Sequence, residues 1–189
     1  TDVPMIAAGG ICDGRGMAAA FALGAEAIQM GTRFVSSAES PVHANYKQAI
    51  VDADDTGTVM LNRKSTPCVR ALKTERTAEI EREGSFDRSI FGSVKDVYFG
   101  GDMEASLALA GQTVGLIHEV LPVAEIIRRT VEGFHAIRRQ QGEIVHKFRL
   151  KAKEILKIAR KIKSLKRRIQ TARDEIDRTR RVFQRAMRR

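Results

Sequence analysis

Short apolar blocks, each closed by glycine, dominate the pattern over the first thirty positions of the chain. Residues 3–8 form an apolar run, residues 16–23 are rich in helix formers and end at Gly24, and residues 25–30 form a second apolar run. A short apolar run bounded by turn residues is typical of a buried strand, and a glycine after a helical stretch is typical of its end. The pattern therefore predicts a βαβ unit with two parallel strands and a right-handed crossover.

Glycines at the ends of both predicted strands form a candidate ligand site. Gly9 and Gly10 follow the first strand, and Gly31 and Thr32 follow the second. Both loops are expected at the carboxyl ends of the strands, the edge where α/β folds bind ligands. Glycine lets backbone N–H groups approach a phosphate closely, and the Thr32 hydroxyl adds a donor. The alternative is that each glycine only ends its strand in a tight turn.

A dinucleotide-binding fingerprint is present in the same stretch but is interpreted as accidental. Residues 14–19 match the pattern G-x-G-x-x-A. In a dinucleotide fold that pattern follows its strand at once, whereas residues 9–13 intervene here. The second strand also ends in residues 29–32, Gln-Met-Gly-Thr, and not in an acidic residue that would bind a ribose.

The middle of the chain has a less regular pattern. Residues 52–55 and 63–67 are predicted loops, and residues 75–83 are predicted to form a charged surface helix or a lid-like insertion over the mouth of the site. Apolar residues recur at helical spacing over 106–117 and again over 123–137, which predicts two outer helices.

The C-terminal segment carries a heptad pattern. Apolar positions lie alternately three and four residues apart from Ile155 onward, and neither Gly nor Pro follows Gly142. A seam sustained over four heptads predicts a continuous helix of about 45 residues, roughly 65 Å long, that forms a coiled coil. We expect it to self-associate, to fold against the first segment or to dock on a partner helix. The seam consists of Ile155, Ile158, Ile162, Leu165, Ile169, Ala172, Ile176, Thr179, Phe183 and Ala186.

The net charge of +10 is concentrated in the same C-terminal segment. Residues 1–141 hold 15 basic and 18 acidic side chains, whereas residues 142–189 hold 18 basic and 5 acidic ones. The basic surface has three interpretations: a solvated coiled-coil face, a contact with nucleic acid or an acidic partner, and a membrane-surface helix. Because Phe148 and Phe183 are its only aromatic residues, any nucleic-acid binding would be directed at the phosphate backbone and sensitive to salt.

Composition excludes several classes of protein. Two Cys in 189 residues exclude a disulfide scaffold and indicate a reducing compartment, and 43% hydrophobic residues exclude a wholly disordered chain. No apolar run approaches the ~20 residues of a membrane span, and the first residues lack the features of a signal peptide, so a soluble cytoplasmic protein is expected. Because Thr1 stands directly before a predicted core strand, the natural N-terminus is expected to lie further upstream.

The four histidines offer little chemistry. His43 follows the second strand and is a weak candidate for a catalytic residue at the mouth of the site; the alternative is an ordinary surface histidine. His118, His135 and His146 fall on predicted helices and are assigned structural roles. No histidine pair has zinc-ligand spacing with a third ligand nearby, and the two Cys are isolated, so no metal site is predicted.

Several sequence blocks match a known family. They are PMIAAGGICDG over 4–14, LGAEAIQMGTRF over 23–34, ESPVHANYK over 39–47, CVRALK over 68–73 and GDMEASLALAGQ over 101–112. Over roughly residues 1–138 the chain closely resembles the C-terminal half of FMN-dependent nitronate monooxygenases. The same blocks are similar to the related FMN-dependent enoyl-acyl-carrier-protein reductases of the same superfamily. The block over 39–47 argues against other phosphate-binding barrels, such as inosine monophosphate dehydrogenase, that share Gly-Gly-Ile.

The resemblance implies a fold and a reaction. The fold is α/β: residues 1–138 would be the C-terminal portion of a (β/α)₈ TIM-type barrel, followed by a basic helical extension over 139–189 that is outside the resemblance. The reaction implied is FMN-dependent oxidation of a small nitronate with O₂, and the alternative is reduction of an enoyl thioester with a nicotinamide. A complete barrel takes ~250 residues, so this chain alone is expected to be an incomplete catalyst. A hypothesis of a different class is a non-catalytic module whose basic tail mediates assembly or nucleic-acid binding.

The resemblance also implies site residues. Gly10, Gln29, Met30, Gly31 and Thr32 correspond to FMN-phosphate and adjacent contacts in the family. Gly9 is a weaker correspondence. The general-base histidine of the family precedes the strand at residue 3, so no residue of this chain is assigned that role.

Overall fold

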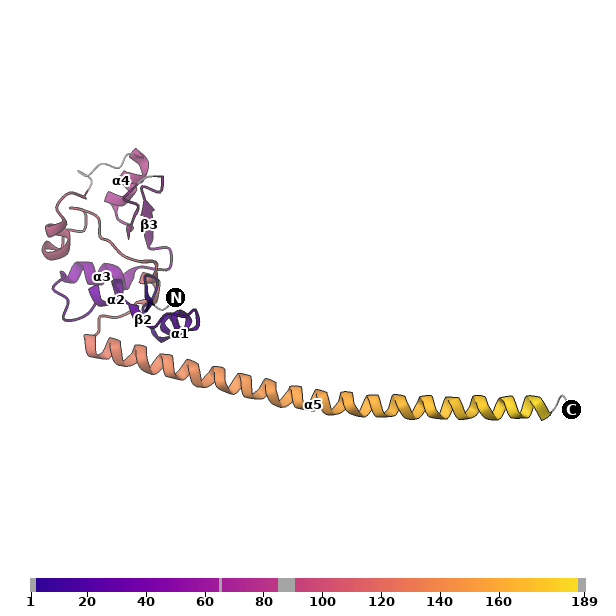
Figure 1. The fold of residues 1–189 in the computed structure, drawn as a ribbon. Coiled ribbons are helices and arrows are strands. Elements are labelled where there is room, and N and C mark those ends of the chain that lie inside the picture. Colours follow the sequence, from indigo (N-terminus) through magenta and orange to yellow (C-terminus); the bar gives the residue numbers. More distant parts are fainter. Residues whose placement is uncertain (1–2, 65, 85–90, 187–189) are drawn as a thin grey trace. The chain divides into compact units, whose positions relative to one another are not determined.

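The computed structural model describes residues 3–64, 66–84 and 91–186, and the chain divides into two compact units, residues 1–138 and residues 139–189. Two two-stranded sheets and several helices form the first unit (Figure 1). The elements in chain order are β1 (Ile6–Ala8), α1 (Gly14–Ala22), β2 (Ala27–Gln29), α2 (Thr32–Val35), α3 (Ala44–Asp52), β3 (Thr58–Leu61), β4 (Val69–Leu72), α4 (Glu75–Glu83), the π-helix η2 (Asp96–Gly100), the 3₁₀-helix η3 (Gln112–Leu116) and α5 (Val123–Ala186).

The predicted βαβ unit is confirmed by β1, α1 and β2. The two strands pair in parallel, with Ile6 opposite Ala27 and Ala8 opposite Gln29. α1 begins where the Asp13 carboxylate accepts a hydrogen bond from the Gly16 N–H at 2.8 Å, a side-chain cap that stabilises the first turn. These contacts are local in sequence, which explains why the apolar runs and glycines were sufficient to predict them.

The start of α1 lies directly against the first turns of α5. A Cβ added to Gly14 would overlap the Phe134 backbone nitrogen and lie 2.5 Å from the Thr130 carbonyl oxygen, so this approach requires glycine. The Phe21 ring meets the Phe134 ring edge to face at 5.2 Å between centroids. The predicted helix over 123–137 is confirmed as the beginning of α5, and its inner face packs on α1.

An antiparallel pair, β3 and β4, was not predicted from the sequence. Thr58 lies opposite Leu72 and Leu61 opposite Val69. The side chains of Val59, Leu61 and Ala71 face a small apolar core together with Ile80 of α4, which lies beside β3 (Figure 1). α4 itself matches the predicted charged helix, ending at Gly84 in the left-handed conformation with φ of +64°.

Residues 106–117 differ from the predicted outer helix. The segment runs alongside β4: Leu72 N–H donates to the Ala108 carbonyl at 2.8 Å, and Ala110 N–H donates to the Arg70 carbonyl at 3.2 Å. Only the end of the segment is helical, as η3. Most of the apolar positions are buried, Leu109 and Leu116 being exposed, but pairing with β4 holds the backbone extended because it satisfies N–H and C=O groups that a helix would otherwise pair internally.

The main core of the first unit is gathered around α3. Tyr46 and Ile50 of this helix are fully buried, and the Tyr46 hydroxyl donates to the Leu109 carbonyl at 2.7 Å. The cluster joins α3 to the segment before η3 and to η2; its other buried members are Cys12, Val42, Leu72, Val97, Ala108, Ala110, Val114 and Ile117.

The second unit, residues 139–189, is described through residue 186 as one helix, the continuation of α5. This confirms a long helix over the heptad region, while its coiled-coil pairing stays a prediction. The side chains of Thr179, Phe183 and Ala186, which the predicted seam includes, lie outside the part of the chain whose side chains are described. Within the described residues, no helix has an apolar stretch long enough to cross a membrane.

Candidate phosphate-binding site

The two glycine loops leave the β1–β2 sheet side by side. Ala8, the last residue of β1, is paired with Gln29, the last residue of β2. Gly9 and Gly10 therefore begin their loop level with Met30 and Gly31, at the carboxyl ends of both strands. The prediction that both loops share one strand edge is confirmed by this register.

The loop backbones have room for a ligand. Gly9 and Gly10 have φ of +88° and +70°, conformations that residues with a side chain rarely adopt. A Cβ added to Gly9, Gly10 or Gly31 would meet nothing within 4 Å, so open space borders all three residues. All three are exposed. An open, glycine-lined edge is the geometry that a phosphate group needs to reach main-chain N–H donors.

Thr32 links the second loop to a third segment. It begins α2, whose first N–H groups have no acceptor within the helix. The Thr32 hydroxyl oxygen accepts a hydrogen bond from the Gly111 N–H at 2.8 Å. The hydroxyl proton is thereby left for another acceptor, because the oxygen is already engaged by a donor. Gly111 was not predicted as a site residue; it lies 79 positions from Thr32, and no local pattern links the two.

Gln29 and Met30 lie at the rim of this edge. Gln29 is exposed and Met30 is half-buried. Both line a shallow apolar pocket whose other walls come from β2, α1, α2 and the first turns of α5, namely Met17, Ile28, Phe34, Ile127, Thr130 and Val131. Mainly apolar walls are typical of pockets that bind small molecules.

Arg33 is a buried residue next to the second glycine loop. It directly follows Thr32, it is 6% exposed, and its guanidinium donates to the Glu119 carbonyl at 2.8 Å. Burial lowers the pKa of Arg33 from its ordinary value, and the Glu119 carboxylate acts in the opposite direction. Its donors are thus used to hold the segment before α5 against α2, which places Arg33 in a structural role.

His43, the weak catalytic candidate, has a local structural role. Its Nδ1 accepts a hydrogen bond from the Asn45 N–H at 3.1 Å and so caps the N-terminus of α3. Its backbone N–H donates to the Tyr98 carbonyl at 2.7 Å, and a Cβ at Gly101 would overlap its ring. The imidazole is fixed by these neighbours and not by either glycine loop.

The remaining histidines and the cysteines lie apart from the loops. The prediction that His118 lies on a helix is wrong: it follows η3 in an exposed loop, whereas His135 and His146 lie on α5 as predicted. Cys12 is 8% exposed and packs in the main core, and burial followed by the Asp13 carboxylate raises its pKa to about 11. The described residues contain no cluster of three His, Cys, Asp or Glu side chains that could hold a metal ion.

A parallel βαβ unit with two glycine loops at one strand edge is typical of an α/β protein. Comparison with known proteins places it more closely. A family model for nitronate monooxygenase matches residues 1–133, so the chain belongs to the nitronate monooxygenase family, a family of oxidoreductases.

Individual relatives agree with this assignment. A probable nitronate monooxygenase of Staphylococcus saprophyticus is 45% identical over 74 residues, which are 39% of this chain and 21% of that protein. A second one, from Staphylococcus aureus strain Newman, is 34% identical over 119 residues, 61% of this chain and 32% of that protein. The chain thus spans a third or less of these curated relatives.

Solved structures share the fold of the first unit. FabK from Thermotoga maritima superposes with a TM-score of 0.69 at 43% identity, over 76% of this chain and 48% of FabK. A nitroalkane oxidase from Streptomyces ansochromogenes superposes with a TM-score of 0.59 at 24% identity, over 75% of this chain and 42% of that protein. The latter likeness concerns the fold alone.

Proposed function

We propose that this chain supplies the FMN-phosphate-binding part of a flavin-dependent oxidoreductase that oxidises small nitronates with O₂. The observation that carries the proposal is the pair of glycine loops, held level by the register of Ala8 with Gln29. The family assignment supports FMN as the cofactor. In this proposal residues 1–138 are the C-terminal portion of a (β/α)₈ barrel, in which a phosphate site after the last two strands recurs.

The residues present fit a phosphate group. Gly10 and Gly31 offer main chain that is open on the side where a Cβ would stand, and Thr32 offers a hydroxyl proton next to the start of α2. Backbone N–H groups of a turn can bind a dianion without a charged side chain. Gln29 and Met30 at the rim would contact the portion of the cofactor next to the phosphate.

The residues of this chain would bind and orient the cofactor. When bound, FMN supplies the redox chemistry of the family, the transfer of electrons between substrate and oxygen. Gly9, Gly10, Gly31 and Thr32 would fix the phosphate end, because two loops from adjacent strands prevent it from rotating. Residues of the whole protein beyond this chain would complete the substrate site, and the general base of the reaction is assigned to none of the residues here.

An alternative activity is reduction of an enoyl thioester with a nicotinamide. FabK, a member of the superfamily, is 43% identical to this chain, whereas the nitroalkane oxidase is 24% identical. Membership of the family therefore does not select between the two reactions that the resemblance implies. Oxygen consumption with a small alkyl nitronate, compared with nicotinamide oxidation in the presence of an enoyl thioester, separates them in the whole protein.

Flavin retention tests the proposal on the chain itself. The purified chain is mixed with FMN, passed through a desalting column and measured for visible flavin absorbance. We expect retained flavin in the wild type and loss of it in Gly31→Asp, because the new carboxylate would stand in the open space next to the phosphate and repel it. Ala22→Asp, an exposed position on α1, carries the same charge change and is expected to retain flavin.

A colourless wild type with intact circular dichroism would contradict FMN binding by this chain. That result would favour the non-catalytic module, in which the basic helix mediates assembly. Equal retention by Gly31→Asp and the wild type would instead place the cofactor elsewhere.

A further inference from the structure

A row of apolar side chains on the second unit lies exposed to solvent. From Ile155 to Ile176, the described positions at alternating spacings of three and four residues all lie on one face of α5. The exposed fraction of the large ones is between 45% and 66%: Ile155, Ile158, Ile162, Leu165, Ile169 and Ile176. This row, from Ile155 to Ile176, is the described part of the predicted seam and is called the seam below. It extends over ~32 Å at 1.5 Å per residue. So much aligned apolar surface favours a second helix laid along it.

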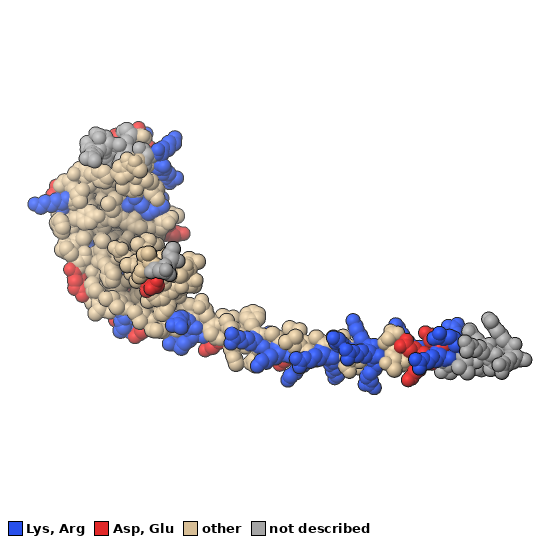
Figure 2. Space-filling view, viewed as in Figure 1, with Lys and Arg blue, Asp and Glu red and all other residues tan. Residues whose placement is uncertain are grey.

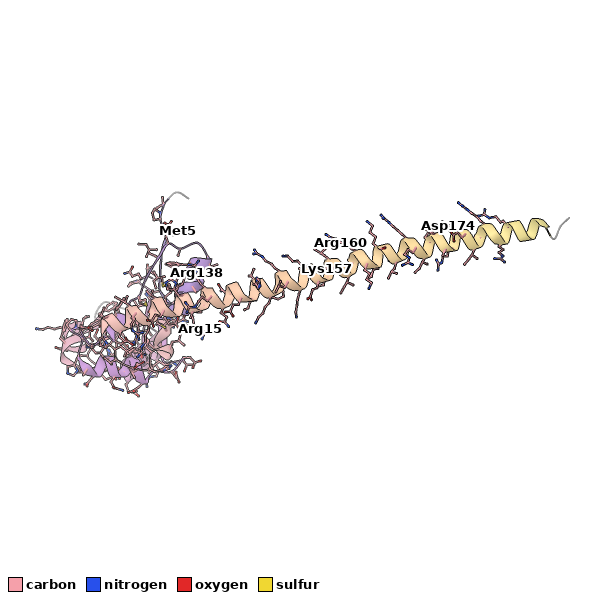
Figure 3. The ribbon with its side chains drawn as sticks, turned by 90° about the horizontal axis from the view of Figure 1, so that it is seen from below. Met5, Arg15, Arg138, Lys157, Arg160 and Asp174 are labelled. Carbon is pink, nitrogen blue, oxygen red and sulfur yellow. The ribbon has the colours of Figure 1, made fainter. Side chains whose placement is uncertain are left out.

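Most of the side chains that border the seam are basic. In the heptad abcdefg with Ile155, Ile162, Ile169 and Ile176 at position a, the bordering positions e and g hold Lys161, Lys166, Arg168 and Arg173 in the middle of the seam, with Ala159 and Glu175 toward its two ends. Residues 155–173 contain eight basic side chains and no acidic one. Lys and Arg side chains follow one another along this part of α5 (Figure 2), and Lys157 and Arg160, at outer positions, project from it (Figure 3).

These charges disfavour a second copy of the same helix as the partner. In a parallel pair, position g of one helix faces position e of the next heptad on the other. Lys161 would then face Lys166 of the second copy and Arg168 would face Arg173, whereas Glu175 would face Arg180. In an antiparallel pair, e faces e and g faces g; Lys166, Arg173 and Arg180 at e are all basic, and g holds Lys161, Arg168 and Glu175. Like-charge contacts outnumber opposite-charge ones in the parallel pair, and the basic e positions disfavour the antiparallel pair.

The apolar row also disfavours nucleic acid as the ligand. A duplex backbone would neutralise the Lys and Arg side chains but would leave the isoleucines of the seam in water or next to phosphates. The described part of the second unit offers Phe148 as its aromatic side chain, so stacking on bases adds little. A ligand that fits both observations must carry an apolar stripe flanked by negative charge.

We infer that the seam binds an acidic helix of a different protein, with apolar residues at its own a and d positions and Glu or Asp at its e and g positions. In parallel coiled coils, isoleucine at a together with leucine at d favours two strands, and the seam has isoleucine at each a position and Leu165 at a d position. Acidic partners at e and g would convert the four like-charge contacts of a self-pair into opposite-charge ones. This inference does not rest on the proposed redox function, since it uses only residues 139–189.

A synthetic helix pair tests the inference on the full 189-residue chain. The first peptide has four heptads with Ile at a, Leu at d and Glu at e and g; the second is identical but has Gln at e and g. Binding of fluorescently labelled peptide is measured by anisotropy at physiological salt. We expect the Glu peptide to bind roughly tenfold or more tightly than the Gln peptide, since several charge contacts add.

Two double variants separate the seam from the charge. Ile162→Asn with Ile169→Asn removes two exposed seam residues and keeps the charge, and we expect it to abolish binding of the Glu peptide. Ser164→Asn with Thr171→Asn places the same residues at outer, uncharged positions with the same spacing, and we expect it to bind like the wild type. Circular dichroism verifies that both variants keep the helix.

Other outcomes would overturn the inference. A dimer of the chain in sedimentation experiments, formed at lower concentration than peptide binding and lost in the Ile162→Asn, Ile169→Asn variant, would make a second copy the occupant. A DNA or RNA duplex bound equally by both double variants, and displacing the peptide, would make nucleic acid the ligand. Equal affinity for the two peptides, or no binding of either, would contradict the acidic partner.

Discussion

Gly111 N–H donates a hydrogen bond to the hydroxyl oxygen of Thr32 at 2.8 Å, and this contact ties the end of β2 to the segment that follows the strand-like stretch beside β4. The Thr32 hydroxyl is therefore oriented by the protein before any ligand arrives. An oriented donor loses less freedom when a phosphate binds than a freely rotating hydroxyl does.

Replacing Thr32 by Val is expected to weaken FMN retention. The variant keeps the shape but loses the acceptor for the Gly111 N–H and the proton for the phosphate, so a loss of about 1 kcal/mol, or roughly fivefold in Kd, is expected. Thr32→Ser keeps the hydroxyl and should behave like the wild type. Flavin titration followed by fluorescence measures both. A Val variant with unchanged affinity would show that the hydroxyl takes no part in binding.

Gly14→Ala is expected to destabilise the first unit. The added methyl group would overlap backbone atoms of residues 130–134. Unlike the end of a flexible side chain, these atoms cannot move aside easily. Overpacking of this kind costs about 1–3 kcal/mol, measured as a loss in the free energy of unfolding. Gly142→Ala, at an open helical position, should instead raise helix stability by up to ~1 kcal/mol. If both variants unfold like the wild type, the approach of α1 to α5 is looser than described.

Arg33→Met should lower stability more than a surface Arg change does. Arg33 is 6% exposed and its guanidinium donates to the Glu119 carbonyl in a partly buried hydrogen bond, so its removal is expected to cost about 1 kcal/mol. Arg15→Met, on the exposed face of α1, serves as the comparison and should cost little. Urea unfolding with unchanged m-values provides the test, and equal midpoints for the two variants would contradict the role given to Arg33.

His43→Ala and His43→Asn together distinguish a cap from a catalytic group. Asn can accept the hydrogen bond from the Asn45 N–H as His43 does, so His43→Asn should keep stability, whereas His43→Ala should lose about 1 kcal/mol. Neither change is expected to alter flavin retention. A loss of nitronate oxidation in the His43→Asn form of the whole protein, with stability intact, would show that His43 has a catalytic role.

The two cysteines should differ in reactivity. Cys12 is buried, with its pKa raised to about 11, and Cys68 is exposed. An alkylating reagent at neutral pH is therefore expected to label Cys68 in the native chain and Cys12 only after unfolding. Because the raised pKa favours the neutral thiol in the folded state, this stabilisation is complete below about pH 9 and is lost as the pH rises toward 11. Rapid native labelling of Cys12, located by peptide mapping, would contradict its burial.

The parts of the fold that sequence predicted are those with local causes. The βαβ unit and α4 follow from short apolar or charged runs closed by Gly24, Gly31 and Gly84, which act within a few residues of themselves. Long regular helices such as α5 can also be predicted from the helical spacing of their apolar residues. The sequence was therefore sufficient to predict the two glycine loops at the ends of β1 and β2. The register of the two strands confirmed that the loops are neighbours.

The parts that sequence missed depend on distant partners. Residues 106–117 have helical spacing, yet β4 pairs with Ala108 and Leu109 and holds them extended. Each strand of the β3–β4 pair is four residues long, too short for alternation to stand out from a loop. The extended stretch before Gly111 places the Gly111 N–H within hydrogen-bond distance of the Thr32 hydroxyl. That contact is a consequence of tertiary structure, which no local pattern predicts.

The pairing of Ala8 with Gln29 has an evolutionary consequence. The hydrogen-bonded ladder, and not the number of residues between the strands, keeps the two glycine loops level. Insertions or deletions at the exposed turn around Leu23 would change the length of the intervening chain and leave the cradle unchanged. A single deletion inside β2 would move one loop by a residue and turn its side chains to the opposite face. Length variation among homologues should therefore accumulate in the turn after α1 and be absent from the two strands.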